Sequence, residues 1–302
     1  TFKMIWITIN ENIYKLQMCC VCVCVQFCNV ILLNFINSFD NNEIPVQENI
    51  QRRFEEVLND INLVYRPIIS KQYITLFNIH DIEIFHAGAT CLKNGILGIP
   101  INFEYNDINR INNETISIQS ASLQWDVEAT KEFHNSLVLS ENAQKFAIAR
   151  QILLLANLNL IYKVFNTFLN LSIGIGVYDI LRLQLKITKQ QRGKNVLCMS
   201  ISAIGVLLFT SLANRQLDYC KDKEINEIIS KLGDKYIQGG IEYYEKLLQK
   251  NRALRILLGS KGTYMYTPVG NQTTWFTQNK IPISEQIDYF KQKMQNIQLK
   301  LV

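Results

Sequence analysis

The chain has 302 residues, of which 48% are apolar, and its mean hydropathy of +0.03 is high for a water-soluble protein. Its 31 Lys and Arg residues nearly balance its 26 Asp and Glu residues, so the formal charge of +5 excludes the strong overall positive field of many nucleic-acid-binding proteins. We therefore expect a membrane protein with no nucleic-acid partner, and the elements below predict an α+β membrane protein that is mainly helical.

The N-terminal segment, residues 1–39, contains an uncharged apolar run at 18–36. We predict that this run is an additional transmembrane span, although Gln26, Asn29 and Asn34 interrupt it, and a buried core helix is the alternative. The run begins with a cysteine cluster, Cys19–Cys22, whose soft thiolates would suit Cu(I). The alternative is that these thiols act as small apolar side chains.

Residues 40–160 are typical of an α+β domain. A helix is expected after Pro45, because its apolar residues recur with helical spacing at Ile50, Phe54, Val57 and Ile61. Short β-type runs follow at 73–77, 82–85, 101–105 and 116–119, and turn signals such as Lys93-Asn94-Gly95 separate them. A further helix is expected from a Ser140 N-cap to residue 158.

Residues 161–214 contain the two best candidate spans, 164–181 and 195–213. The second has 19 residues without a charge, which corresponds to roughly 28 Å of helix and nearly matches the hydrocarbon core of a bilayer. The first is weaker, because Asn166, Asn170 and Asp179 interrupt it. Asp179 is tolerable near the end of the span, where it would either pair with Arg182 or mark an ion path. Gly174 and Gly176 favour close packing of the two helices.

A purely basic loop, residues 182–194, joins the two spans. No Asp or Glu occurs from residue 181 to residue 217, and short loops with such a bias stay on the side from which a protein is inserted. We therefore predict a transmembrane helical hairpin whose flanking regions both lie on the opposite side. The topology-determining residues are Arg182, Lys186, Lys189, Arg192 and Lys194.

Residues 215–302 are expected to be helical. A polar helix at 218–238 should break or bend at Gly239-Gly240, and a second helix should continue to 258, with Gly259 at its C′ position. The last helix, from residue 283, carries an apolar seam that is expected to pack against its own domain, with a separate protein as the alternative. Six residues of the second helix are candidates for contact with a partner: Tyr243, Tyr244, Lys246, Lys250, Arg252 and Arg255. The alternative for the four cations is a solvated face, and one of the two tyrosines is expected in the core.

The histidines do not predict catalysis. A zinc peptidase helix needs two His one turn apart, whereas none of the three His of this chain, His80, His86 and His134, lies within one turn of another. We therefore predict a protein that is not an enzyme, with no catalytic residue, no metal ligand and no cofactor.

Two stretches resemble the signature blocks of the transmembrane protein 177 family. They are LSENAQKFAIARQ at 139–151 and GGIEYYEKLLQKNRALRILLGSKGTYMYTPVGN at 239–271, and weaker matches, GIPINF at 98–103 and Trp125-Asp126, occur in the expected order. The resemblance implies a multi-pass protein of the mitochondrial inner membrane that assembles cytochrome c oxidase without catalysis. The implied partners are subunit 2 of the oxidase, its chaperone and the lipid bilayer, and the resemblance carries no ligand-binding residue over to this chain.

The basic loop and this resemblance together predict an orientation. The loop would face the matrix, so the 40–160 domain and the 215–302 region would lie in the intermembrane space, where subunit 2 exposes its large domain. The partner surface is then expected on the 40–160 domain and on the helix at 243–258. The alternatives are a metallopeptidase relative that has lost its metal, and a small membrane transporter.

Overall fold

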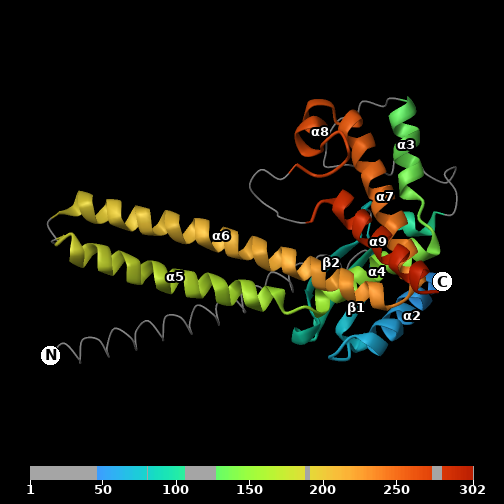
Figure 1. Ribbon diagram of the computed structural model, residues 1–302, viewed down its shortest axis with the longest axis horizontal. Coiled ribbons are helices and arrows are strands. Elements are labelled where there is room, and N and C mark those ends of the chain that lie inside the picture. The colour runs from blue at the N-terminus through green and yellow to red at the C-terminus, as the bar shows by residue number, and fades with distance from the viewer. Residues whose placement is uncertain (1–45, 80, 106–126, 188–190, 274–280, 302) are drawn as a thin grey trace. The chain divides into compact units, whose positions relative to one another are not determined.

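The computed structural model describes residues 46–79, 81–105, 127–187, 191–273 and 281–301, and its described part is mainly helical with a small sheet (Figure 1). The chain divides into two compact units. The hairpin unit contains Leu158–Leu217, and the folded unit combines Glu43–Asn157 with Asp218–Val302. The two stretches that the sequence analysis treated as separate regions thus fold together, because the last helices pack on those that precede the hairpin.

The sheet of the folded unit has three strands, β1 (Ile74–Ile79), β2 (Phe85–Ala89) and β3 (Asn94–Pro100), in the order β1-β3-β2. The central strand β3 is parallel to β1 and antiparallel to β2. Its residues from Gly95 onward are all buried, on both faces of the strand, as expected for the central strand of a covered sheet.

The strand predictions were partly wrong. The run at 73–77 is confirmed as β1, but the run at 82–85 overlaps β2 only at Phe85, and the run at 101–105 is instead a short 3-10 helix, Ile101–Glu104. The central strand β3 lies where turn signals were noted, because its two glycines and terminal proline weaken the strand pattern that its buried isoleucines would otherwise give. The run at 116–119 lies outside the described residues.

Helix α4 (Glu141–Ala156) forms the centre of the folded unit. Most of its residues from Ala143 to Leu155 are buried, because it packs against α2 (Glu48–Val64), the sheet and α7 (Asp234–Leu257). The predicted N-cap is confirmed, since the Ser140 hydroxyl accepts a hydrogen bond from the Ala143 amide at 3.2 Å. The apolar stripe predicted on α2 is also confirmed as buried.

Helix α7 runs without interruption through Gly239-Gly240, so the predicted break there was wrong. The break falls at Gly233, whose φ of +116° is a left-handed conformation, and α6 (Arg192–Lys231) ends just before it. The glycine pair serves close packing instead: a Cβ atom on Gly239 would lie 2.2 Å from the carbonyl oxygen of Asn142 in α4. Gly259, with φ of +56°, is confirmed at the C′ position of α7.

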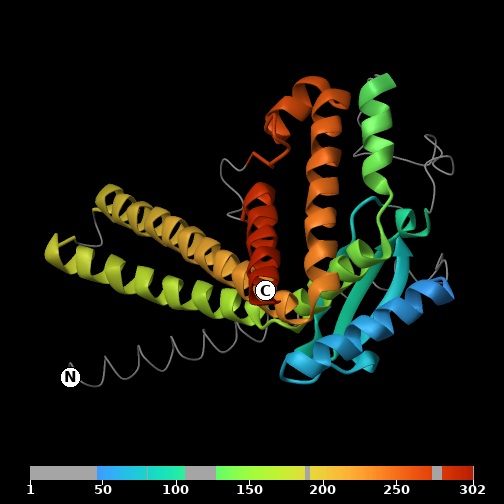
Figure 2. The same ribbon diagram turned by 45° about the vertical axis from the view of Figure 1, so that its right-hand side comes forward.

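The other three helices described in the folded unit pack along α7. They are α3 (Val127–Leu137), α8 (Gly259–Met265) and α9 (Ile283–Leu301). The seam of α9 contributes Ile287 and Phe290 to the main core, so the prediction that this helix packs against its own domain is confirmed. Figure 2 shows α9 and α7 side by side.

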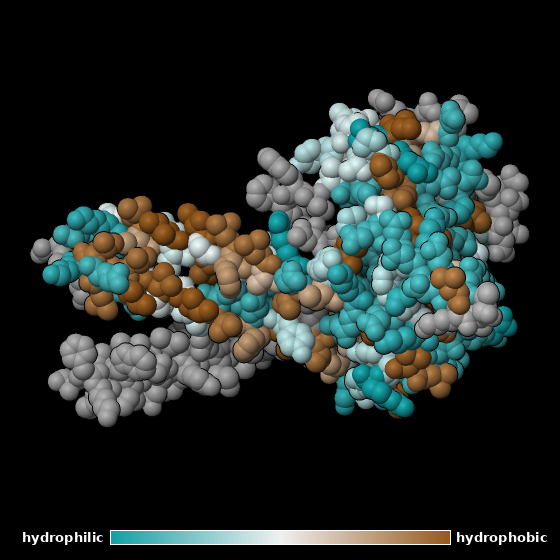
Figure 3. All heavy atoms as spheres, viewed as in Figure 1, coloured by the Kyte–Doolittle hydropathy of each residue, from teal (hydrophilic) through white to brown (hydrophobic). Residues whose placement is uncertain are grey.

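The hairpin unit consists of α5 (Asn159–Gln184) and the apolar part of α6, and both predicted runs lie within these helices. Each helix is long and apolar enough to cross a membrane, and only 11% of each apolar window is buried, whereas a core helix of a soluble protein would be mostly buried. Figure 3 shows apolar side chains along the outside of both helices and polar side chains at their far end. The predicted span at 18–36 lies outside the described residues.

Polar contacts join the two helices of the hairpin. The Ser202 hydroxyl donates to the carbonyl oxygen of Gly174 at 2.6 Å, and a Cβ atom on Gly174 would lie 2.2 Å from the Val206 side chain. The packing role expected for Gly174 is therefore confirmed, whereas Gly176 has open space beside it. Asp179 is exposed and forms no ion pair with a described residue, so the structure gives no support for the expected pairing with Arg182.

Candidate functional site

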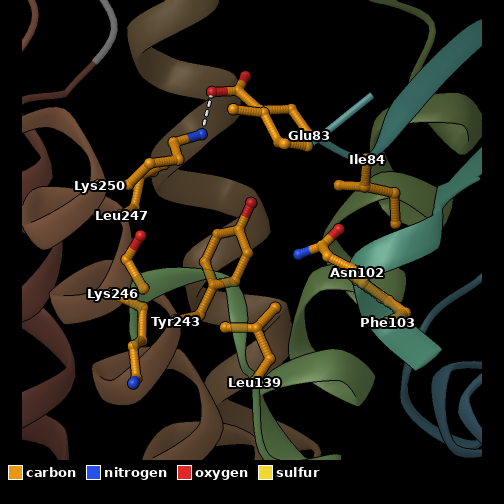
Figure 4. A pocket seen from close by; sticks show the side chains of 11 residues that line it. Glu83, Ile84, Asn102, Phe103, Leu139, Tyr243, Lys246, Leu247 and Lys250 are labelled. Carbon is orange, nitrogen blue, oxygen red and sulfur yellow. Dashed lines mark hydrogen bonds and ion pairs between the residues drawn. The ribbon is translucent and has the colours of Figure 1, made fainter. Parts of the chain in front are cut away.

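The folded unit contains a pocket with roughly 350 Å³ of empty volume, including the part open to solvent (Figure 4). Its walls come from the bend between β1 and β2, the 3-10 helix after β3, the end of α3 with the following linker, and one face of α7. The α7 residues follow one another at helical spacing and therefore share one face. The lining residues are Ile82, Glu83, Ile84, Asn102, Phe103, Ser136, Leu139, Tyr243, Lys246, Leu247 and Lys250.

One end of the pocket is polar. The Lys250 ammonium donates to the Glu83 carboxylate, and the two side chains differ sharply in exposure, at 5% for Lys250 and 55% for Glu83. The Tyr243 hydroxyl points toward this ion pair (Figure 4) and has no hydrogen-bond partner among the described residues. Burial raises the pKa of Tyr243, and the nearby Glu83 carboxylate raises it further, so the hydroxyl remains a donor at neutral pH.

The rest of the pocket is mainly apolar. Ile84, Phe103 and Leu139 are buried, and Leu247 is half-buried. The Asn102 amide donates to the carbonyl oxygen of Leu137 at 3.0 Å, while its own side-chain oxygen is buried without a described partner. The pocket therefore combines an apolar wall with a few convergent polar groups, which is the usual composition of a binding site.

The four cations predicted as a partner surface on α7 all have partners within the folded unit. Lys246 donates to the carbonyl oxygen of Asn135 at 2.6 Å, and Arg252 pairs with Glu132 at 3.3 Å. Arg255 donates to backbone carbonyl oxygens of the segment that includes α8. The interpretation as a solvated face holds for the exposed Arg252 and was wrong for Lys250, which is buried because the β1–β2 bend covers it.

The two tyrosines of α7 have different surroundings. Tyr244 is buried in an aromatic cluster, with ring centroids 5.4 Å from Phe146 and 6.1 Å from Phe290, and burial raises its pKa to about 12. Tyr243 is half-buried and lines the pocket. This agrees with the expectation of one core tyrosine, and contact of Tyr243 with a partner stays a prediction.

A buried ion pair lies near this cluster. The Arg150 guanidinium of α4 contacts Asp222 of α6 at 2.8 Å, and both side chains are largely buried, at 14% and 7% exposure. The sequence analysis missed this pair, as it missed Glu83 and Asn102, because partners so far apart along the chain share no local pattern. The only available signal was the position of Arg150 within the apolar α4 segment.

The basic residues of the loop gather where α5 ends and α6 begins. Lys186, with φ of +47°, ends the first helix, and Lys186, Arg192 and Lys194 are exposed, while Arg182 is half-buried. The Tyr178 hydroxyl donates to the Asn195 side chain at 2.7 Å and joins the two helices near this end. Lys189 lies outside the described residues.

Within the described ranges no three His, Cys, Asp or Glu side chains lie close enough together to hold a metal ion. His86 lies on β2 and His134 on α3, and burial lowers the pKa of His134. His80 and the Cys19–Cys22 cluster lie outside the described residues.

A family model and individual relatives that match this chain carry the same name. The family model described as "Transmembrane protein 177" matches residues 103–295. Transmembrane protein 177 of Danio rerio is 34% identical over 236 residues, which cover 75% of this chain and 72% of the relative. The protein of that name from Mus musculus is 28% identical over 82% of this chain and 79% of its own length. The one from Homo sapiens is 28% identical over 75% of this chain and 71% of its own length. No solved structure matches the chain significantly.

Proposed function

The chain belongs to the transmembrane protein 177 family, and from this membership we propose that it is a non-enzymatic assembly factor of the mitochondrial inner membrane. In this role it binds newly made cytochrome c oxidase subunit 2 and the chaperone of that subunit, and stabilises them until assembly proceeds. The family resemblance supports the role, and the geometry described above supports a topology suited to it.

The topology is argued from the two stretches of chain that make up the folded unit. The stretches before and after the hairpin, Glu43–Asn157 and Asp218–Val302, form one compact unit with a shared core, so both must lie on the same side of any membrane. The chain between them must then cross an even number of times. Two apolar helices with exposed apolar side chains meet this requirement.

The basic loop supports the orientation. The cations Lys186, Arg192 and Lys194 lie at the end of the hairpin, and a cationic turn of this kind is retained on the side of insertion. For a protein inserted from the matrix, the folded unit then lies in the intermembrane space, where it can meet the soluble domain of subunit 2.

A labelling experiment tests this orientation. One variant keeps only Cys91, which is exposed in the folded unit, and a second carries Lys194→Cys as its single cysteine. In mitoplasts with a ruptured outer membrane, a maleimide that cannot cross membranes should label Cys91 directly, and should label the Lys194→Cys variant only after detergent is added. The reverse pattern would overturn the orientation, and release of the chain by alkaline carbonate would overturn the membrane spans.

The assembly role is tested by affinity purification of the full chain from solubilised mitochondria. Subunit 2 and its chaperone should co-purify, and newly made subunit 2 should be degraded faster when the chain is depleted. Recovery of the intact chain without subunit 2, together with an unchanged lifetime of that subunit, would contradict the proposal.

A further inference from the structure

The two residues of the ion pair at the polar end of the pocket differ in their exposure to solvent. Lys250 lies on the long helix α7 and is only 5% exposed, whereas Glu83 lies in the bend between β1 and β2 and is 55% exposed. A buried ammonium group needs an anionic partner, because leaving it unpaired away from water is costly. Lys250 therefore needs a carboxylate, but nothing in its position requires that this carboxylate belong to its own chain.

We propose that the pocket binds an acidic–apolar segment of the partner protein, whose carboxylate replaces Glu83 on Lys250 while its neighbouring apolar side chain enters the space beside Leu139 and Leu247. This inference rests on the proposed assembly role and names the chemistry by which the partner is recognised.

The chain's own bend indicates what the pocket accepts. The segment Ile82-Glu83-Ile84 presents a carboxylate flanked by two isoleucines, and all three residues line the pocket. A partner segment with the same chemistry could meet Lys250 in the same way. Only the Glu83 side chain, which is exposed, has to turn away, while Ile84 stays buried in the core.

The other lining groups fit a carboxylate next to an apolar side chain. The Tyr243 hydroxyl points to the ion pair and lacks a described partner, so it supplies a second donor for the incoming carboxylate (Figure 4). The Lys246 ammonium donates to Asn135 and contributes its apolar stem to the wall. The pocket is open to solvent, so a segment of another chain can reach its lining residues from outside.

The test uses two labelled peptides that do not depend on the identity of the partner. One carries the sequence Ile-Glu-Ile, and its control carries Ile-Gln-Ile. The Glu83→Gln variant of the full chain, purified in detergent, loses the competing carboxylate and should bind the acidic peptide roughly tenfold tighter than the unmodified chain does. The Lys250→Gln variant should lose this binding, and the control peptide should bind to neither variant.

Melting temperature separates binding from misfolding. The acidic peptide should raise the melting temperature of the Glu83→Gln variant and leave that of Lys250→Gln unchanged. A matched control is Glu132→Gln, which removes another acid paired with α7, outside the pocket, and should leave peptide affinity unchanged. Equal peptide affinity in the Glu83→Gln and Lys250→Gln variants would overturn the inference.

The same variants then test the natural partner. Glu83→Gln should increase the yield of co-purified subunit 2, Lys250→Gln should decrease it, and a carbodiimide should couple Lys250 to an Asp or Glu of that subunit next to an apolar residue. If subunit 2 does not co-purify with the unmodified chain, the assembly role is refuted, but the peptide-binding result for the pocket is not. Unchanged yields in both variants, with subunit 2 still present, would refute the pocket as its binding site.

Discussion

Replacing Gly239 by Ala tests whether the glycine pair of α7 breaks the helix or permits close packing. The new Cβ atom would lie 2.2 Å from the carbonyl oxygen of Asn142, about 1 Å short of ordinary van der Waals contact. That oxygen belongs to the backbone of the first turn of α4, so it cannot rotate away as a side chain could. The two helices would have to move apart.

Two opposing effects set the magnitude of the change. Ala stabilises a helix interior by about 1 kcal/mol relative to Gly, whereas overpacking of a tight interior costs typically about 1–3 kcal/mol and more where backbone must shift. Because Gly239 meets backbone, we expect the clash to outweigh the propensity gain and to lower the free energy of unfolding by about 2 kcal/mol. For a folded unit of this size, such a loss lowers the melting temperature by roughly 4–8 °C.

The assay is thermal unfolding of the full chain in detergent, followed by far-ultraviolet circular dichroism. The matched control is Gly205→Ala in α6, where the new Cβ atom would meet nothing within 4 Å, so its melting temperature should not fall below the original. A Gly239→Ala protein that melts at or above the original temperature would refute the close helix crossing and favour a glycine break.

Three further predictions concern the folded unit and use the same unfolding assay. Asp222→Ala should lower the free energy of unfolding by about 3 kcal/mol, because Arg150 would be left buried without its anion, and a loss below about 1 kcal/mol would mean that water reaches the guanidinium. Ser140→Ala should cost about 1 kcal/mol through loss of the α4 N-cap, whereas Ser140→Thr should keep most of the stability, because its hydroxyl can still cap the helix and donate to the Glu242 carboxylate. Burial lowers the pKa of His134, so its neutral form is favoured on folding: its contribution is complete above the unfolded pKa of 6.5 and is lost as the pH falls through the folded pKa. His134→Gln should flatten the decline of melting temperature below that pH, and an unchanged decline would assign it to other groups.

The predictions from the sequence that are confirmed concern local features. The N-cap at Ser140, the buried stripe of α2 and the apolar runs within α5 and α6 follow from residue type and spacing over a few turns. The family resemblance was likewise local, because it rested on continuous blocks that the family model also matches.

The predictions from the sequence that were wrong concern patterns with two meanings. Gly239-Gly240 satisfies the requirements of both a helix break and a close helix crossing, and only the presence of Asn142 on the facing helix decides between them. The central strand β3 was missed for a similar reason, since glycine and proline suggest a turn until burial between two neighbouring strands is known.

The amino-acid sequence by itself determined the helical hairpin, its basic turn and the family, because helix length, charge bias and sequence blocks are read over neighbouring residues. Only the tertiary structure decided that the stretches on either side of the hairpin share one core, and that Glu83 lies on Lys250. The physical reason is that such contacts join residues far apart along the chain, whose side chains carry no sign of their partners until the backbone has brought them together.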